Sequence, residues 1–152
     1  MRKINVVAIA KGKSPDLAYR ILADFEAYKA HSDVVREVVI LERDEKRSVS
    51  TWEVNFRQGI LRWKEEDHYD PAGLRMHFEQ LEGDAEEFRG EWLFSGVPEG
   101  TRIEFKAEFD MGIPSMNDII EPIAEMALKE NIQAIISGLM QGNVLFPKSV
   151  PD

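Results

Sequence analysis

Two acidic side chains, Glu65 and Asp67, stand in a segment whose alternate positions are aromatic. In an extended strand, side chains two residues apart share a face at about 7 Å, so both carboxyls lie with Trp63 and Tyr69. Burial raises a carboxyl pKa, and such a group serves as general acid or base in enolisation, aldol condensation or dehydration. The alternative is a strand that bulges or ends near Lys64, which leaves both carboxyls in water.

Aromatic side chains supply the walls of this expected site. Trp52, Trp63 and Trp92 lie on the apolar sides of their segments, where they either sandwich an aromatic or polyene ligand or fill the core. Tyr69 and Gln80 share the inward parity, and either could form a hydrogen bond with a ligand oxygen. We therefore expect catalytic roles for Glu65, Asp67 and Tyr69, and ligand contacts from Trp52, Trp63, Phe78, Gln80, Trp92, Phe105 and Asn131.

For the other polar residues we expect structural or solvated roles. Asn131 lies beside an apolar helical stripe, where its amide either enters the cavity or, as we favour, forms a structural hydrogen bond to the sheet. His31, His68 and His77 lack metal-ligand spacing, so we expect solvated histidines and no metal. The sequence has no glycine-rich phosphate loop and no serine in a nucleophile elbow. This argues against a nucleotide enzyme or a serine hydrolase, and we expect no cofactor.

The elements that carry these residues follow from the hydrophobic period. Residues 3–10 predict a first strand, Ser14 before a proline predicts a helix start, and residues 24–30 predict a second short helix. From about residue 34 the period changes to two, and turn signals separate six strands. The apolar face of the first helix should consist of Leu17, Ile21 and Leu22. The clearest strand spans 101–111, where Ile103, Phe105, Ala107, Phe109 and Met111 alternate with charged residues.

The last element is a helix with a wide apolar side. Ser115 to Asp118 resembles a capping box, and Pro122 either stands in the first turn of a helix that begins near Glu121 or kinks a longer one. The apolar stripe comprises Ile120, Ala124, Leu128, Ile132, Ile135 and Leu139. The opposite, polar face comprises Glu121, Glu125, Lys129, Gln133 and Gln141.

The predicted fold class is α+β. We expect a helix-grip domain, in which a seven-stranded curved antiparallel sheet surrounds a long C-terminal helix and two short helices follow the first strand. One helix is about 10 Å across, so it covers the apolar face of such a sheet only if the sheet curls around it. A curled sheet around one helix leaves a gap, which predicts an interior ligand cavity.

The amino-acid composition restricts the class of protein and the kinds of site it can contain. The 152 residues are 43% hydrophobic, and we expect one ligand-binding domain over residues 1–146 and a flexible tail over 147–152. The absence of cysteine excludes disulfides, cysteine zinc sites and thiol nucleophiles, and it fits a cytoplasmic protein. The net charge of −9 disfavours nucleic-acid binding. The apolar stretch of residues 1–10 is too short for a signal peptide, and without a run of about 20 apolar residues we expect no stable membrane insertion.

Four segments carry a resemblance to a known superfamily. They are SPDLAYRILADFEAY from Ser14, FRGEWLF from Phe88, GTRIEFKAEFDM from Gly100, and the helix around Asn131. Over residues 3–145 the chain resembles the START-like, or birch-pollen-allergen-like, helix-grip proteins, and among them the polyketide cyclase/aromatases and the coenzyme-Q-binding-protein-like branch. The resemblance implies a hydrophobic small-molecule ligand, such as a polyketide, quinone or lipid, with an acyl carrier protein as a candidate partner.

The chain departs from the polyketide aromatases at their catalytic strand. Those proteins carry a segment of the type Trp-x-Ser-x-Arg, and here Trp63, Glu65 and Asp67 occupy the three places. A carboxylate cannot hold a ketide oxygen as an arginine does, so the arginine-based mechanism does not transfer. Three functions stay open: a cofactor-independent cyclase or aromatase, a non-catalytic carrier of a lipid, quinone or aromatic ligand, and a module that binds a protein partner.

Overall fold

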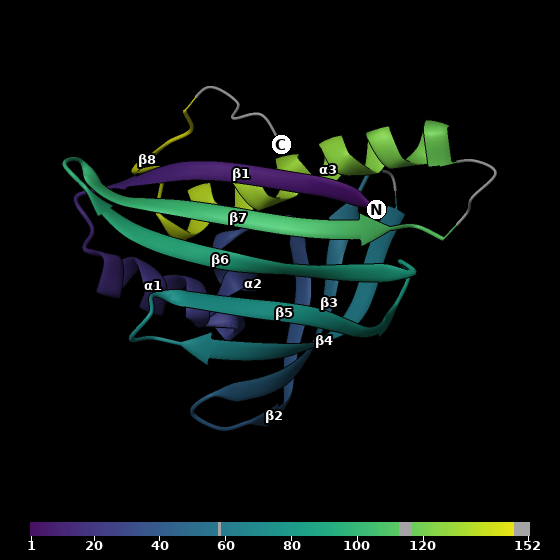
Figure 1. Cartoon of the computed structure of the whole chain (residues 1–152), viewed down its shortest axis with the longest axis horizontal. Helices are drawn as coiled ribbons and strands as arrows, with labels where there is room; N and C mark the ends of the chain where they lie inside the picture. The colour runs from purple at the N-terminus through teal and green to yellow at the C-terminus, as the bar shows by residue number, and fades with distance from the viewer. Residues whose placement is uncertain (58, 113–116, 148–152) are drawn as a thin grey trace.

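Eight antiparallel strands form a single sheet. A computed structural model describes residues 1–57, 59–112 and 117–147 of the chain. The strands follow the order β2-β3-β4-β5-β6-β7-β1-β8 (Figure 1). Their bounds are β1 Arg2–Lys11, β2 Val35–Arg43, β3 Arg47–Phe56, β4 Gly59–Asp70, β5 Arg75–Gly83, β6 Glu87–Val97, β7 Gly100–Asp110 and β8 Val144–Leu145.

Helices occupy the two places in the chain where the period of 3.6 predicts them. Ser14 caps the first helix, because its hydroxyl accepts a hydrogen bond of 3.3 Å from the backbone N–H of Leu17. A short 3₁₀ turn then leads into the second helix. The bounds are α1 Pro15–Ala23, the 3₁₀ turn Phe25–Ala27, α2 Tyr28–His31 and α3 Asn117–Leu139.

The sheet curls around α3. On one side of the helix, Glu125 forms an ion pair of 3.1 Å with Arg2 on β1. On the other side, the Asn131 amide donates to the Asn55 carbonyl on β3 at 2.7 Å. In a flat sheet, β1 and β3 would lie about 24 Å apart, because four strands separate them. A helix about 10 Å wide reaches both strands only if the sheet wraps it, as Figure 1 shows. The helix-grip prediction is therefore confirmed.

The core lies between the inner face of this sheet and the helices. Alternate side chains of each strand point inward, as the period of two predicts. The buried residues of β6 and β7 include Phe88, Trp92, Phe94, Ile103, Phe105, Ala107 and Phe109. The helices contribute Leu22, Tyr28, Ala124, Leu128, Ile135 and Leu139 to the same core. This interior is mostly aromatic and aliphatic, so a charged group within it stands out.

Several local expectations need correction. The sheet has an eighth strand, β8, which is only two residues long and gives no readable alternation. Leu17 is 38% exposed, because the buried face of α1 is formed by its neighbours Ala18, Tyr19 and Leu22. Pro122 lies inside α3 and not in its first turn. The expected capping box at 115–118 and most of the expected tail, 148–152, lie outside the described residues.

Candidate functional site

Two carboxyl groups are buried side by side on the inner face of β4. Glu65 and Asp67 are 4% and 1% exposed. The β3–β4 register places Ser50 opposite Glu65 and Ser48 opposite Asp67. The strand stays paired on both sides, and a register shift beside Lys64 on the β5 side does not turn the two carboxyls outward. Their inward orientation, which the alternation predicts, is therefore observed.

Donors from the strands hold both carboxyls in place. Ser48 and Ser50 each donate a hydrogen bond of 2.8 Å to Oδ2 of Asp67. The indole N–H of Trp63 donates to Oε1 of Glu65 at 2.6 Å. The indole N–H of Trp52 in turn donates to Ser50 at 2.9 Å. Each hydroxyl and indole of this network is thus committed to an acceptor within the protein.

Burial shifts the pKa of one carboxyl of the pair upward. Burial raises the pKa of Glu65 well above its usual value, the hydrogen bond with Asp67 and its charge raise it further, and the Trp63 indole opposes this shift. Glu65 is therefore the group of this site that keeps its proton to a higher pH than an ordinary glutamate does. Oδ1 of Asp67 is buried and has no hydrogen-bond partner in the described part of the chain.

Two tyrosines border the pair. The Tyr69 hydroxyl lies 2.6 Å from the Ser48 oxygen. Because the Ser48 hydrogen goes to Asp67, Tyr69 donates and Ser48 accepts. Burial raises the pKa of Tyr69 to about 12, so the phenol keeps its proton at neutral pH. Tyr28, which is fully covered, donates to the Leu22 carbonyl at 2.5 Å, and burial raises its pKa well above the usual value.

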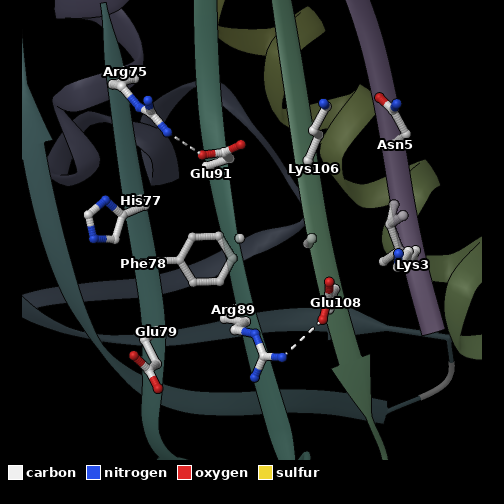
Figure 2. Close-up of a pocket in the computed structure, with 13 residues that line it drawn as sticks. Lys3, Asn5, Arg75, His77, Phe78, Glu79, Arg89, Glu91, Lys106 and Glu108 are labelled. Atoms are coloured by element: carbon white, nitrogen blue, oxygen red, sulfur yellow. Dashed lines mark hydrogen bonds and ion pairs between the residues drawn. The ribbon is translucent and has the colours of Figure 1, made fainter. Parts of the chain in front are cut away.

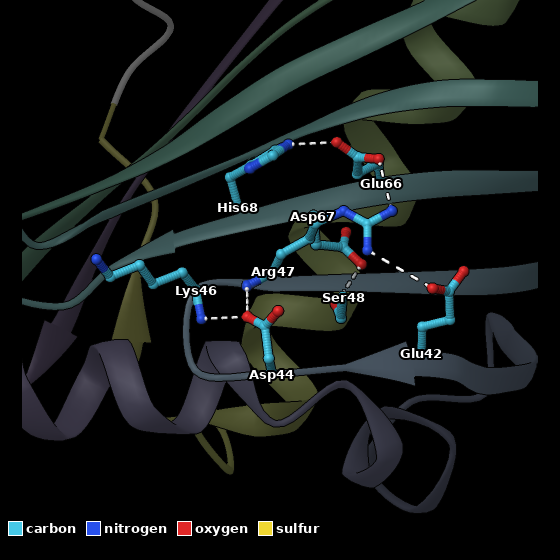
Figure 3. A network of polar contacts seen from close by, with 8 residues as sticks. All are labelled: Glu42, Asp44, Lys46, Arg47, Ser48, Glu66, Asp67 and His68. Atoms are coloured by element: carbon cyan, nitrogen blue, oxygen red, sulfur yellow. Dashed lines mark hydrogen bonds and ion pairs between the residues drawn. The ribbon is translucent and has the colours of Figure 1, made fainter.

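Charged neighbours of the pair lie on the opposite face of the sheet. Glu66, between the two buried carboxyls, accepts from Arg47 at 2.9 Å and lies 2.7 Å from Nε2 of His68. Arg47, and secondarily His68, lower the pKa of Glu66. Figure 3 shows this alternation: Asp67 turns toward Ser48, while Glu66 and His68 lie together on the other side. The same strand therefore presents a partly exposed ion-pair network on its outer face and a buried carboxyl pair on its inner face.

The expected aromatic residues fall into two groups. Trp52 and Trp63 stack in parallel next to the carboxyl pair, with ring centroids 5.8 Å apart. Phe78 and Trp92 both pack against Phe105, at centroid distances of 6.0 and 4.7 Å. Phe88 contacts both Trp63 and Phe78 and so joins the two groups. The sheet thus carries one continuous aromatic wall along its inner face.

Two expected ligand contacts make hydrogen bonds within the protein. Gln80 donates its amide N–H to the Ala85 carbonyl at 2.9 Å. Asn131 donates to β3, which is the structural role considered for it above. This bond fixes α3 against the sheet. Gln80 has a buried Oε1 for which the described residues provide no hydrogen-bond partner.

Two hollows lie on the outer face of the sheet. One has a volume of about 590 Å³ and crosses β5, β6, β7 and β1, where Arg75 pairs with Glu91 and Arg89 pairs with Glu108 (Figure 2). The other, of about 290 Å³, lies over β2, β3, β4 and β5. Neither hollow lies between the sheet and α3, so the expected interior cavity remains a prediction.

Sequence reasoning missed three residues of the interior. Ser48 and Ser50 are fully buried, and they share the inward parity of Trp52, which was the available signal. Glu121 was expected on the polar face of the last helix and is instead 7% exposed, so that assignment is wrong. Its helical phase matches Leu128, seven residues later, and that spacing was readable from the sequence.

The described residues hold no obvious metal or membrane element. Among residues 1–57, 59–112 and 117–147, no three His, Asp or Glu side chains gather closely enough to hold a metal ion. Within the same residues, no helix combines the length and apolar character that crossing a membrane requires.

Comparison with known proteins agrees with the fold. A family model described as polyketide cyclase / dehydrase and lipid transport matches residues 12–136. The sequence matches no curated protein. A solved structure from Thermus thermophilus is 25% identical, with a TM-score of 0.84, and the match covers 93% of this chain and 97% of that one.

Two further structures extend the comparison. The Zhui aromatase/cyclase of a Streptomyces species is 20% identical over 93% of each chain, with a TM-score of 0.81. A START superfamily protein from Mycobacterium smegmatis is 16% identical over 91% of this chain and 97% of that one, with a TM-score of 0.74. The resemblance to START-like helix-grip proteins is confirmed, and the chain belongs to the polyketide cyclase / dehydrase and lipid transport family.

Proposed function

We propose that the protein binds a hydrophobic small molecule between the inner face of its sheet and α3, and that it catalyses cofactor-independent cyclisation or dehydration of this molecule. The observation that carries the proposal is the burial of two carboxyls, Glu65 and Asp67, side by side in an apolar interior that raises the pKa of Glu65. In this proposal Glu65 is the acid and Asp67 is the base. A polar pair of this kind costs folding energy that an apolar pair would not. Functional sites are where such costs are found.

The pair has both components that dehydration needs. In a β-hydroxy ketone, the Asp67 carboxylate takes the proton from the carbon beside the carbonyl. Glu65 gives its proton to the hydroxyl, the C–O bond breaks, and water leaves as the C=C double bond forms. One proton then resides on Asp67, and its transfer to Glu65 along their hydrogen bond restores the starting state.

Aldol cyclisation uses the same groups. Asp67 takes the proton from the nucleophilic carbon, a C–C bond forms, and Glu65 protonates the carbonyl oxygen that becomes the new hydroxyl. The stacked indoles of Trp52 and Trp63 provide a flat wall that would hold a polyketide chain in a folded conformation. Tyr69 acts through Ser48, whose orientation toward Asp67 it fixes, and is therefore a positioning residue in this scheme.

The test uses a simple β-hydroxy ketone, the aldol adduct of benzaldehyde and acetone. Its dehydration product absorbs strongly in the near ultraviolet, so turnover is followed by absorbance. We expect wild-type protein to accelerate the reaction, and Glu65→Gln and Asp67→Asn each to lower the rate by roughly 100-fold or more. Both changes preserve side-chain volume, and thermal unfolding verifies that each variant folds.

Glu66→Gln is the matched control. Glu66 lies between the two residues on the same strand but faces outward, so its substitution should leave the rate unchanged. Equal rates for the wild type and both inner variants would remove the acid–base assignment. A loss of rate in the control variant as well would point to a general effect on β4 and not to the pair.

A carrier without catalysis is the second candidate. The observation that favours it is the set of protein donors beside the pair, because Ser48 and Ser50 already bind Oδ2 of Asp67 and Trp63 already binds Oε1 of Glu65 without any ligand. A carrier would bind hydrophobic molecules equally well in the wild type and in Glu65→Gln. Binding without any turnover in the wild type would favour the carrier.

A further inference from the structure

Gln80 presents a buried acceptor to the interior. Its amide N–H donates to the Ala85 carbonyl at 2.9 Å, which fixes the orientation of the amide. Its Oε1 is buried and has no donor among the described residues. The β4–β5 register places Gln80 directly beside Glu65, on the inner face of the sheet. Because buried polar atoms are ordinarily hydrogen-bonded, a bound ligand is a candidate donor to this oxygen.

Glu121 presents a second acceptor from the opposite wall. It lies on α3, is 7% exposed, and has a buried Oε1 without a partner in the described part of the chain. On a helix of 3.6 residues per turn, Glu121 lies within about 20° of Leu128 and in phase with Leu139. Both leucines are buried in the core, so Glu121 also points toward the sheet.

The donors near the carboxyl pair are already in use. The hydrogens of Ser48 and Ser50 go to Asp67, and that of Tyr69 goes to Ser48. The Trp63 indole donates to Glu65. Apart from the Glu65 proton proposed above, a ligand carbonyl would therefore meet no free donor in this network. A ligand hydroxyl would meet two acceptors that lack one.

We propose that the ligand is a flat hydrophobic molecule with at least two phenolic or enolic hydroxyl groups, which donate to Gln80 and Glu121. This inference rests on the interior binding proposed above but not on catalysis. The aromatic wall of Trp52, Trp63 and Phe78 suits a planar ring system. A ketone or ether of the same shape leaves both acceptors unpaired, which lowers affinity by roughly tenfold per acceptor.

The test compares two probes with one carbon skeleton. Tryptophan fluorescence is titrated with a dihydroxynaphthalene and with the dimethoxynaphthalene of the same substitution pattern. We expect the diol to bind wild-type protein at least about tenfold more tightly than the ether. The double variant Gln80→Met, Glu121→Met removes both acceptors at similar volume and should bring the ratio of the two dissociation constants close to one. If this variant does not fold, Gln80→Met alone must lower the ratio.

Glu79→Gln serves as the control, because Glu79 precedes Gln80 on β5 and lines the outer hollow. It should keep the wild-type ratio. Equal affinities for diol and ether in the wild type, a preference that survives in the double variant, or binding of neither probe would each overturn the inference. A diamine of the same skeleton that binds more tightly than the diol would overturn its assignment to hydroxyls. A diol preference without dehydration activity would leave this inference standing and remove only the proposed catalysis.

Discussion

Replacing Glu65 by glutamine should make the protein more stable at neutral pH. The amide has the same length, can accept from the Trp63 indole, and can donate to Asp67 in place of the carboxyl proton. It therefore preserves the contacts of the protonated state. It removes only the titration of the buried group.

The magnitude follows from the direction of the pKa shift. The Glu65 pKa is raised well above its ordinary value of 4.5, chiefly by burial. Below about pH 4.5 the carboxyl is protonated in both folded and unfolded protein, and its stabilising contribution is fully present. As the pH rises from there toward the folded pKa, the unfolded chain alone ionises. The wild type then loses about 1.4 kcal/mol of unfolding free energy per pH unit, which Glu65→Gln does not lose.

Thermal unfolding of both proteins over a pH series measures this difference. For a chain of this length, 1.4 kcal/mol corresponds to a shift in Tm of about 3 to 6 °C. The Tm advantage of Glu65→Gln should therefore widen by about that amount per pH unit above pH 4.5. Glu66→Gln should behave oppositely, because Arg47 lowers the Glu66 pKa and the resulting stabilisation is lost as the pH falls.

Parallel Tm curves for the wild type and Glu65→Gln would refute the reasoning, since they would mean that Glu65 titrates alike in both states. A variant that is less stable than the wild type throughout neutral pH would refute it too. That result would indicate that the ionised carboxylate, and not the acid, is the stabilised form.

Three further substitutions test the framework of the site. Ser50→Ala removes one donor to Asp67 and should lower the unfolding free energy, measured by urea titration, by about 1–3 kcal/mol. An unchanged unfolding free energy would contradict the buried hydrogen bond. Gly138→Ala places a methyl group against the backbone carbonyl of His31. It should lower the unfolding free energy by about 1–3 kcal/mol, although alanine has the better helix propensity. A gain in stability would contradict the close approach of α2 and α3. Asn131→Asp removes the donor that joins α3 to β3, so it should lower Tm and speed amide hydrogen exchange in the second half of α3. Unchanged exchange rates would show that this hydrogen bond does not stabilise α3.

Much of the fold was readable from the sequence because one face of each strand is apolar. The alternation of Glu65 and Asp67 with Trp63 and Tyr69 predicted the inward direction of both carboxyls, and their burial agrees. Register follows from the same pattern, since a slip of one residue would turn every inner side chain outward. The two-residue strand β8 gives too short a pattern to detect.

The partners of the pair were harder to predict, because small polar residues fit either face of a strand. Ser48 and Ser50 share the inward parity of Trp52, but their role as donors became identifiable only through their positions opposite Asp67 and Glu65. Glu121 was misassigned because a charged residue near a helix start is ordinarily solvated. The sequence shows that Glu121 is in phase with Leu128, but only the packing of α3 against the sheet shows that this phase outweighs the charge.

A crystal structure of the protein with the naphthalene diol tests the central claim most directly. Electron density for the diol should lie between the sheet and α3, against the stacked indoles of Trp52 and Trp63, with a hydroxyl within hydrogen-bonding distance of Gln80. Density confined to the outer groove across β5, β6, β7 and β1, with the interior filled by the protein's own aromatic side chains, would contradict the account.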